Sequence, residues 1–299
     1  MAKKTQWPFS RKLAVGIWVA LATFYVIEFG VPFDRATQFL LIVSAATAFS
    51  VGTTTGLTRI FSDWVPFFGL LYAYDFSRGA ADTFGFTVRV KELLNLEMTW
   101  FSRFFDGQLP TLWLQHHLYN PSHVAWWEGA VALMYCSHFV VPWAVLGTLY
   151  IRNRDLWVKF ARRVITISIA ALITYILVPA APPWYAAKHG LTEPIARIAT
   201  RGWSALGIPI AGQIISLGQG VVNQVAAIPS LHAGMTVTIS LFFWPRVRNI
   251  TRAFFIAYVS FMVFTLTYGG EHYMVDAFLG IVYAIVVEII CRLWERWRG

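Results

Sequence analysis

The stretch GAVALMYCSHFVVPWAVLGTLYI, residues 129–151, decides the fold class because it is apolar almost throughout and carries no formal charge. A bilayer core about 30 Å thick is crossed by about 20 apolar residues in a helix, and this stretch has that length. Uncharged stretches of similar length cover residues 36–58, 164–187 and 253–270. The sequence therefore predicts an all-α, polytopic integral membrane helix bundle.

Further apolar segments set the number of predicted passes. Residues 13–27 form one, and a segment that begins near His272 and continues through 277–287 forms another, which brings the total to six. Segments 60–74 and 231–244 are shorter, so the prediction is six to eight membrane helices.

The first pass also resembles the apolar part of a secretory signal. Basic residues precede it, and an Ala20-Leu21-Ala22 sequence could serve as a cleavage site. The apolar stretch continues past that point, which favours a retained signal anchor over a cleaved peptide.

The composition excludes two broad classes of protein. The chain is 57% hydrophobic and only 13% charged, whereas soluble domains are about 25% charged. Disorder is excluded because the chain has ample apolar surface to bury. Cys136 and Cys291 both lie in apolar segments, so neither a disulfide framework nor a cysteine metal site is predicted.

The net charge of +9 is explained by where the basic residues lie. With eight passes, sixteen of the 24 lysines and arginines fall on one side, which the positive-inside rule makes cytoplasmic; they are Lys3, Lys4, Arg11, Lys12, Arg59, Arg152, Arg154, Lys159, Arg162, Arg163, Arg246, Arg248, Arg252, Arg292, Arg296 and Arg298. Both termini are then cytoplasmic, and a nucleic-acid partner is not expected.

This topology divides the chain into three parts. Residues 1–74 hold N-terminal membrane helices, residues 75–123 form an extracytoplasmic segment, and residues 124–299 form the predicted catalytic core. Within the second part, 109–118 is predicted to be an interfacial helix. Residues 181–230 are also expected to face outward and to be partly helical.

Two motifs carry the titratable groups that could do chemistry on the outward face. They are IPSLHAG, residues 228–234, and YGGEHYMVDAFLG, residues 268–280. His272 and Asp276 are four residues apart, so on a helix they share one face. The carboxylate can fix the imidazole tautomer and leave the other ring nitrogen free to attack. His232 supplies a second imidazole at the same membrane depth.

Two chemistries fit two histidines and a carboxylate. A metal site would favour a third close ligand, but Glu271 points about 100° away from His272 on a helix. Phosphoryl transfer uses every part: His272 attacks phosphorus, Asp276 stabilises the imidazolium, and His232 protonates the departing oxygen. Ser230 and the first turn after it can bind phosphate oxygens. We therefore predict no metal and no cofactor.

The two motifs resemble signatures of the type 2 phosphatidic acid phosphatase superfamily, in the form found in its inositol phosphorylceramide synthase-like branch. YDFSRG (74–79), PTLWLQ (110–115), SHFVVP (137–142) and APPW (181–184) also resemble that branch. The resemblance implies a six-helix core, with His272 as the phosphorylated nucleophile, Asp276 as its partner and His232 as the acid. It further implies transfer of a phospho-alcohol, such as phosphoinositol, to an acceptor.

The sequence departs from the superfamily pattern at three places. Its first motif, a lysine followed by Arg-Pro, is not found before APPW, Leu266 stands where an arginine often precedes the third motif, and Glu271 replaces one of two histidines. The cations that bind phosphate must therefore come from elsewhere. Arg78 is the first choice, followed by Lys188, Arg197 and Arg201.

Other residues are predicted to line the substrate cavity or its lipid entrance: Asp75, His138, Trp184, Tyr185 and Tyr273. His116, His117 and His123 with Glu128 match no familiar metal-ligand spacing. The expected partners are a lipid phosphate substrate and membrane lipids.

Three functions remain open at this point. The first is a phosphotransferase, and the second is a lipid phosphate phosphatase, acting on phosphatidate or a polyprenyl phosphate with water as acceptor. The third is a transporter or lipid-binding scaffold that reuses the fold.

Overall fold

The computed structural model describes residues 7–29, 35–53, 56–79, 85–220 and 224–298. In these ranges the regular elements are helices, and no strand longer than an isolated bridge is found. The chain forms two compact units, one of Met1–Ala73 with Trp143–Ala161 and one of Tyr74–Pro142 with Arg162–Gly299.

The first unit contains α1 (Phe9–Phe29), α2 (Arg35–Ser50) and most of α3 (Leu57–Gly79). Polar contacts join its helices: Trp18 Nε1 donates to Ser44 Oγ at 3.0 Å, and Arg154 Nε donates to Asp63 Oδ2 at 2.7 Å. Asp63 is therefore compensated by an ion pair, which explains how a carboxylate is tolerated beside the aromatic residues of α3.

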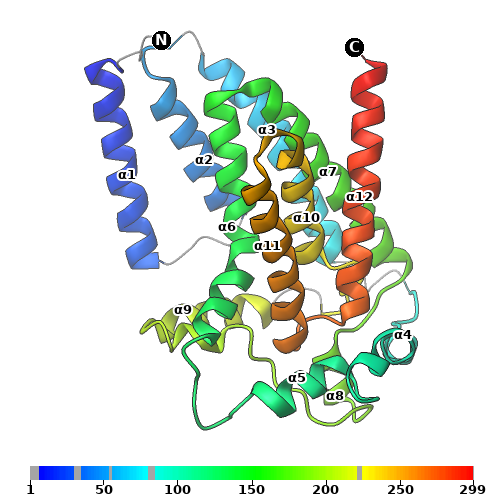
Figure 1. Cartoon of the computed structure of the whole chain (residues 1–299). Coiled ribbons are helices and arrows are strands. Elements are labelled where there is room, and N and C mark those ends of the chain that lie inside the picture. Colours follow the sequence, from blue (N-terminus) through cyan, green and yellow to red (C-terminus); the bar gives the residue numbers. More distant parts are fainter. Residues whose placement is uncertain (1–6, 30–34, 54–55, 80–84, 221–223, 299) are drawn as a thin grey trace. The chain divides into compact units, whose positions relative to one another are not determined.

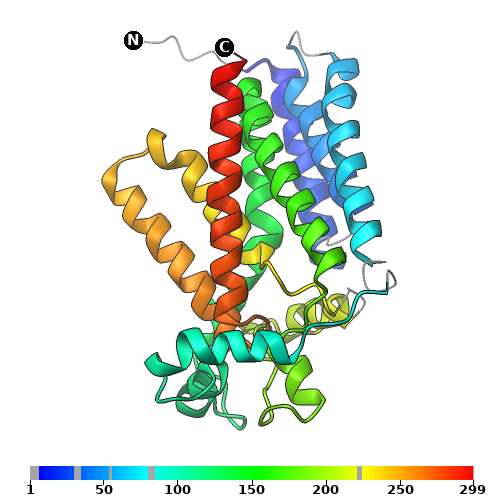
Figure 2. The same ribbon diagram turned by 90° about the vertical axis from the view of Figure 1, so that its right-hand side faces the viewer.

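The second unit is built around α10 (Leu231–Phe243), α11 (Asn249–Tyr268) and α12 (Met274–Trp297) (Figure 1). α10 packs along α12, and Figure 2 shows α11 inclined away from α12 and meeting it at the lower end. Parts of α6 (Glu128–Arg152) and α7 (Arg154–Leu177) belong to the same unit.

Two glycines allow α10 and α12 to approach closely. A Cβ placed on Gly280 would lie 2.2 Å from the carbonyl oxygen of Ser230, and one on Gly234 would lie 3.1 Å from the carbonyl oxygen of Gly280. The crossing therefore depends on residues without side chains, and it lies at the end of the helices that carries the histidine motifs.

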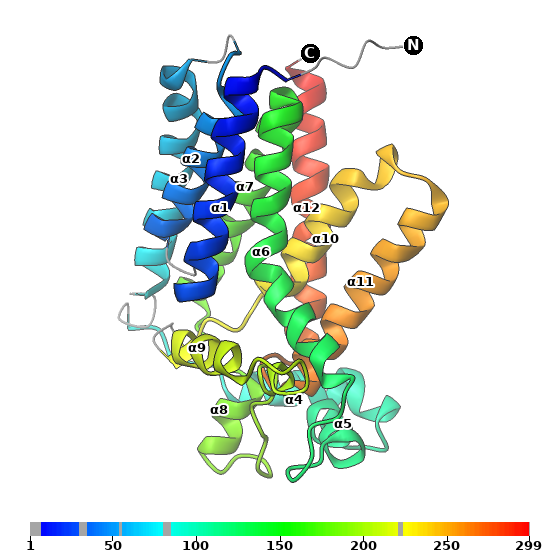
Figure 3. The same ribbon diagram turned by 90° about the vertical axis from the view of Figure 1, so that its left-hand side faces the viewer.

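Short helices gather at that end of the second unit, as Figures 1 and 3 show. They are α4 (Lys91–Phe101), α5 (Pro110–Leu118), α8 (Pro183–Lys188) and α9 (Pro209–Gly220), with short 3₁₀ turns at Ser102–Phe104 and Arg201–Trp203. A third 3₁₀ turn, Trp244–Arg246, follows α10.

Backbone hydrogen bonds tie the intervening segments together. Arg89 N donates to Pro179 O at 2.8 Å, and Ala180 N donates to Val225 O at 2.7 Å. These bonds fix the chain shortly before IPSLHAG, so α10 begins from an anchored position.

Most of the expected helices are present. Every predicted pass contains a helix, and among the described residues five helices are long and apolar enough to span a bilayer: α1, α6, α7, α11 and α12. The helix predicted over 109–118 is α5, and the outward segment 181–230 is partly helical, as expected. Lys3 and Lys4 lie outside the described residues.

Two predicted boundaries are wrong. A loop was expected between residues 151 and 164, but only Asn153 separates α6 from α7, so Arg163 lies inside a helix. It is 2% exposed there because Glu288 and Glu295 neutralise it at 2.5 and 2.6 Å. The pass predicted over 164–187 ends at Leu177, since prolines follow closely and break the helix.

Candidate active site

The N-terminus of α10 places His232. Ser230 is the N-cap, and its hydroxyl accepts from Ala233 N at 3.5 Å. The Ser230 N–H donates to the carbonyl oxygen of Asp276 at 3.0 Å, so the starts of α10 and α12 are hydrogen-bonded to each other. Ser230 is fully buried, and this side of the site is therefore rigidly held.

His272 and Asp276 come together at the start of α12. His272 Nδ1 lies 3.4 Å from Asp276 Oδ2, and the same carboxylate oxygen accepts from Tyr273 N at 3.0 Å. The expectation that His272 lies on the helix is wrong, because α12 begins at Met274. The contact arises instead from the capping turn at the start of α12, where Tyr273 is the N-cap and its N–H donates to Asp276.

Three imidazoles from three helical regions meet in this site. The rings of His232 and His272 have centroids 5.6 Å apart, and His138 of α6 lies 4.1 Å from His232. Tyr135 also stacks on His232, with ring centroids 4.9 Å apart. His232 Nε2 is buried and has no hydrogen-bond partner within the described ranges. A buried ring nitrogen without a partner is costly, and such cost is typical of a functional site.

Arg78 lies at the edge of the same group of residues. It stands near the C-terminus of α3 with its Cζ 6.0 Å from the centroid of Tyr74. It interacts electrostatically with His232 and with Tyr175, and the Tyr175 hydroxyl donates to Pro229 O at 2.8 Å. The first-choice cation is thus close to the histidines. Asp75, which precedes it on the same helix, is half-buried.

The other predicted cations are placed differently. Arg197 forms a two-pronged pair with Glu271, with Nε–Oε1 and Nη2–Oε2 distances of 2.9 Å each. Arg201 pairs with Glu128 at 2.8 Å, and Lys188 is exposed at the end of α8. The charges of Arg197 and Arg201 are therefore already compensated by carboxylates.

Aromatic candidates fall into two environments. Trp184 is half-buried and lies under the Arg197 guanidinium, 4.8 Å from Cζ to ring centroid. Tyr185 contacts Trp184 at 5.9 Å. Tyr273 is fully buried and packs in a hydrophobic cluster with Leu93.

The remaining histidines of the outward segment have ordinary contacts. His116 lies 3.4 Å from Glu193, and His117 stacks on Trp113 at 4.2 Å. Over the described part of the chain, no group of three or more histidine, cysteine, aspartate or glutamate side chains is arranged to hold a metal.

One residue beside the site was missed at the sequence level. Glu97 of α4 is fully buried, and both of its carboxylate oxygens accept hydrogen bonds from the first backbone amides of α12. The available signal was its spacing in KELLNLEMTWF, four residues after Leu93 on the buried face.

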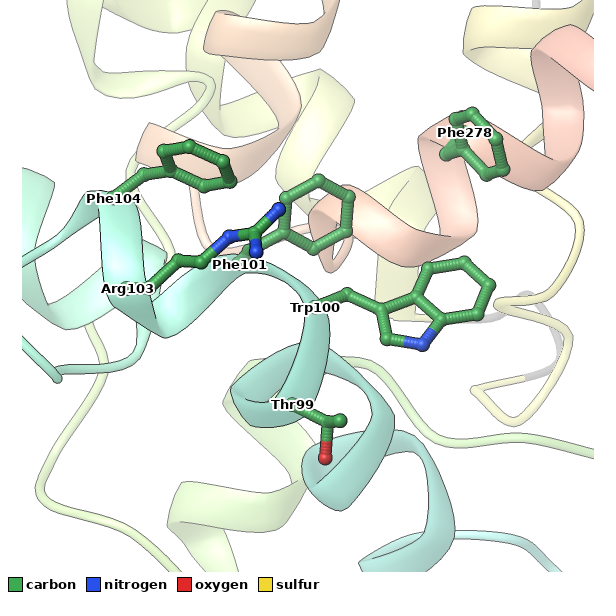
Figure 4. Close-up of a pocket in the computed structure, with 6 residues that line it drawn as sticks. All are labelled: Thr99, Trp100, Phe101, Arg103, Phe104 and Phe278. Carbon is green, nitrogen blue, oxygen red and sulfur yellow. The ribbon is translucent and has the colours of Figure 1, made fainter.

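An open cavity of about 430 Å³ is lined by the end of α4, the 3₁₀ turn that follows it and Phe278 of α12. None of its lining residues is one of the three histidines or Asp276, as Figure 4 shows; they are Thr99, Trp100, Phe101, Arg103, Phe104 and Phe278.

Comparison with known proteins agrees with this geometry. The chain is 26% identical to the phosphoinositol dihydroceramide synthase of Bacteroides thetaiotaomicron, an alignment that covers 93% of this chain and 90% of that protein. It is 32% identical to the inositol phosphorylceramide synthase catalytic subunit AUR1 of Saccharomyces cerevisiae over 36% of this chain and 28% of that one. No solved structure matches significantly.

The match to a protein family covers the three histidines and Asp276. Residues 105–290, more than half of the chain, match the PAP2 superfamily, and this range contains His138, His232, His272 and Asp276. Together with the two relatives, the match makes the protein an enzyme of lipid phosphoryl transfer rather than a transporter or scaffold. The chain belongs to the PAP2 superfamily of phosphotransferases and phosphatases.

Proposed function

We propose that this enzyme transfers a phospho-alcohol group from a membrane lipid to an acceptor hydroxyl through a phosphorylated His272. The observation that carries the proposal is the contact between His272 and the buried Asp276, with His232 5.6 Å away across the site. The relative named phosphoinositol dihydroceramide synthase, which aligns over 93% of the chain, supports phosphoinositol as the group and dihydroceramide as the acceptor.

In the first step, His272 attacks phosphorus with the ring nitrogen that does not face Asp276. A nitrogen–phosphorus bond forms, and the bond between phosphorus and the glyceride oxygen of phosphatidylinositol breaks. His232 gives a proton to that oxygen, so diacylglycerol leaves as a neutral alcohol. Asp276 stabilises the positive imidazole ring through its contact with Nδ1.

In the second step, the acceptor hydroxyl attacks the same phosphorus. His232, now neutral, takes the hydroxyl proton, the nitrogen–phosphorus bond breaks, and His272 is restored. Water in place of the acceptor would release inositol phosphate from this intermediate, and with a monoester such as phosphatidate as the substrate the same two steps would release inorganic phosphate, which is the phosphatase reaction.

The phosphate oxygens need cationic and hydrogen-bond donors. Arg78 is suited to this role because its planar guanidinium can bind two oxygens at once, and it interacts with His232. We assign further substrate contacts to Ser230, His138 and Asp75. Trp184 keeps its predicted role at the lipid entrance, and Lys188 keeps its predicted role as a further phosphate cation. Tyr273, predicted to contact the substrate, would have to move to be reached, since it is fully buried.

We also propose that the site faces the extracytoplasmic side. Within the second unit, α12 runs from the histidine site to a C-terminus that bears Arg292, Arg296 and Arg298. Arg246 and Arg248 lie between α10 and α11, at the ends remote from His232 and His272. The positive-inside rule makes the end with these arginines cytoplasmic.

The test is to incubate purified protein with phosphatidylinositol and dihydroceramide and to measure diacylglycerol, the inositol phospholipid product and inositol phosphate. We expect equal amounts of diacylglycerol and transfer product. Inositol phosphate without a transfer product would show hydrolysis in place of transfer. Release of inorganic phosphate from phosphatidate in a separate incubation, without a transfer product from phosphatidylinositol, would replace the proposal with the phosphatase reaction.

Two histidine variants complete the test. His272→Ala should abolish both product formation and a protein-bound, acid-labile phosphoryl label. His123→Ala removes an exposed histidine of the outward segment and should behave as wild type. Activity retained in His272→Ala would refute the covalent mechanism.

A further inference from the structure

Glu97 is a buried carboxylate outside the set of residues that the reaction uses directly. It lies on α4, an 11-residue helix, and has no exposed surface. Glutamate is almost never fully buried unless it is paired. No ion pair to Glu97 is found in the described ranges, so its partners must be sought among neutral groups.

Those partners are the first two amides of α12. Met274 N donates to Glu97 Oε1 at 2.9 Å, and Val275 N donates to Glu97 Oε2 at 2.8 Å. Amides in the first turn of a helix have no acceptor within the helix, and a negative charge there also compensates the positive end of the helix dipole. Because the two oxygens are used separately, the carboxylate fixes both the position and the direction of this turn.

The same turn carries the nucleophile and its partner. His272 stands two residues before Met274, and Asp276 directly follows Val275. The titratable groups of α12 that face Glu97 are Asp276 and Tyr273. A change at Glu97 therefore acts first on the segment that holds His272 against Asp276.

Hydrophobic packing prevents α4 from shifting to compensate. Leu93, one turn before Glu97, is 3% exposed and lies in a cluster with Tyr273, Val275 and Ile228. Tyr273 and Val275 of this cluster lie at the start of α12, and Ile228 lies in the segment before Ser230. The carboxylate is thus held at a fixed distance from both halves of the site.

We propose that Glu97 is a positioning residue for phosphoryl transfer, which holds His272 and Asp276 in register with His232 by accepting the first two amide protons of α12. The inference rests on the proposed function, since it assumes His272 as nucleophile. A carboxylate accepts both N–H groups, whereas a carboxamide offers one oxygen and turns an NH₂ group toward the second amide.

The experiment compares Glu97→Gln and Glu97→Asp with Glu92→Gln. Glu92 is a matched control, because it lies on the same helix but is half-exposed and pairs with Arg89 at 2.8 Å. In Glu97→Gln we expect kcat to fall about tenfold to a hundredfold, with KM changed less than about threefold because Glu97 does not touch the substrate. Glu92→Gln should keep wild-type kcat.

The pH profile separates positioning from a general loss of folding. Burial raises the pKa of Glu97 to about 7, so in wild type the two-amide contact strengthens as the carboxyl ionises near neutral pH. We expect the decrease of kcat on the acid side of the pH profile to occur at lower pH in Glu97→Gln than in wild type. In Glu97→Asp, which keeps the charge, it should occur at the wild-type pH. A lower kcat in Glu97→Gln with an unchanged pH profile, or an unchanged kcat, would overturn the proposal.

Failure of this inference is distinguishable from failure of the proposed function. If His272→Ala is inactive while Glu97→Gln matches wild type in kcat and pH profile, only the positioning role is refuted. If His272→Ala remains active, the covalent mechanism fails and the positioning role fails with it.

Discussion

Replacing Gly280 with alanine tests the close crossing of α10 and α12 on which the site depends. The added Cβ would lie 2.2 Å from the carbonyl oxygen of Ser230, and real Cβ contacts essentially never fall below 3.0 Å. The backbones must therefore separate by at least about 0.8 Å. Neither contacting group is a flexible side chain, so the shift passes to the N-cap of α10 and to His232.

The size of the effect follows from that displacement. A shift of about 1 Å in a reacting group costs about 10²-fold in rate, and overpacking costs about 1–3 kcal/mol of stability. We expect kcat for lipid phosphoryl transfer to fall about a hundredfold in Gly280→Ala, with a lower thermal midpoint in detergent. The hydrogen bond from Ser230 N to Asp276 O, 3.0 Å long, should be weakened as well.

A matched glycine provides the control. Gly147 of α6 has no atom within 4 Å of a built Cβ, so Gly147→Ala should leave kcat unchanged and raise helix stability slightly. Gly280→Ala with kcat within twofold of wild type would refute the argument, because it would mean that the two helix starts need not be so close.

Three further predictions concern charged groups. Arg163→Met should lower the free energy of unfolding by about 1–3 kcal/mol, since it leaves the buried Glu288 with Arg292 as its remaining cation; denaturation in detergent measures this, and an unchanged midpoint would contradict it. Arg197→Lys should lower kcat/KM about threefold to tenfold, because lysine cannot reproduce the two-pronged contact with Glu271, and steady-state kinetics at fixed lipid composition test it. Burial raises the pKa of Glu97 from 4.5 to about 7. The stability contributed by its neutral form is therefore fully present below pH 4.5 and is lost as the pH rises through about 7, by up to about 3 kcal/mol. The thermal midpoint of wild type should fall relative to that of Glu97→Gln over that range, and the difference between them should not change above it.

The helices were largely predictable because long apolar stretches have few alternatives in a bilayer. The boundary between α6 and α7 was not, because it depends on contacts distant in sequence. Arg163 was expected in a cytoplasmic loop, but Glu288, 125 residues away, neutralises it inside the helix. A single sequence contains no signal of that pairing.

The reacting groups were predictable for a related reason. Titratable residues are rare in this chain, so His232, His272 and Asp276 stood out, and the structure brings their side chains together. The contact between His272 and Asp276 was expected from a helix face but arises from a capping turn. Glu97 was missed because an acidic residue on an amphipathic helix normally faces water, and only the packing of α4 against α12 buries it.

The two ends of α12 show how stability and reactivity are divided in this enzyme. At the C-terminal end, the carboxylate of Glu288 is bound by both Arg163 and Arg292 at 2.5 Å, so its charge is fully compensated. At the N-terminal end, Glu97 is held where burial disfavours its charge, and His232 Nε2 is buried without a partner among the described residues. A buried ring nitrogen without a partner is unfavourable in the resting protein, and a phosphate diester that arrives with oxygens to accept its proton relieves that cost. His232 therefore lies where the substrate can satisfy it, whereas Glu97 and Glu288 are bonded within the protein and hold the two ends of α12 in place.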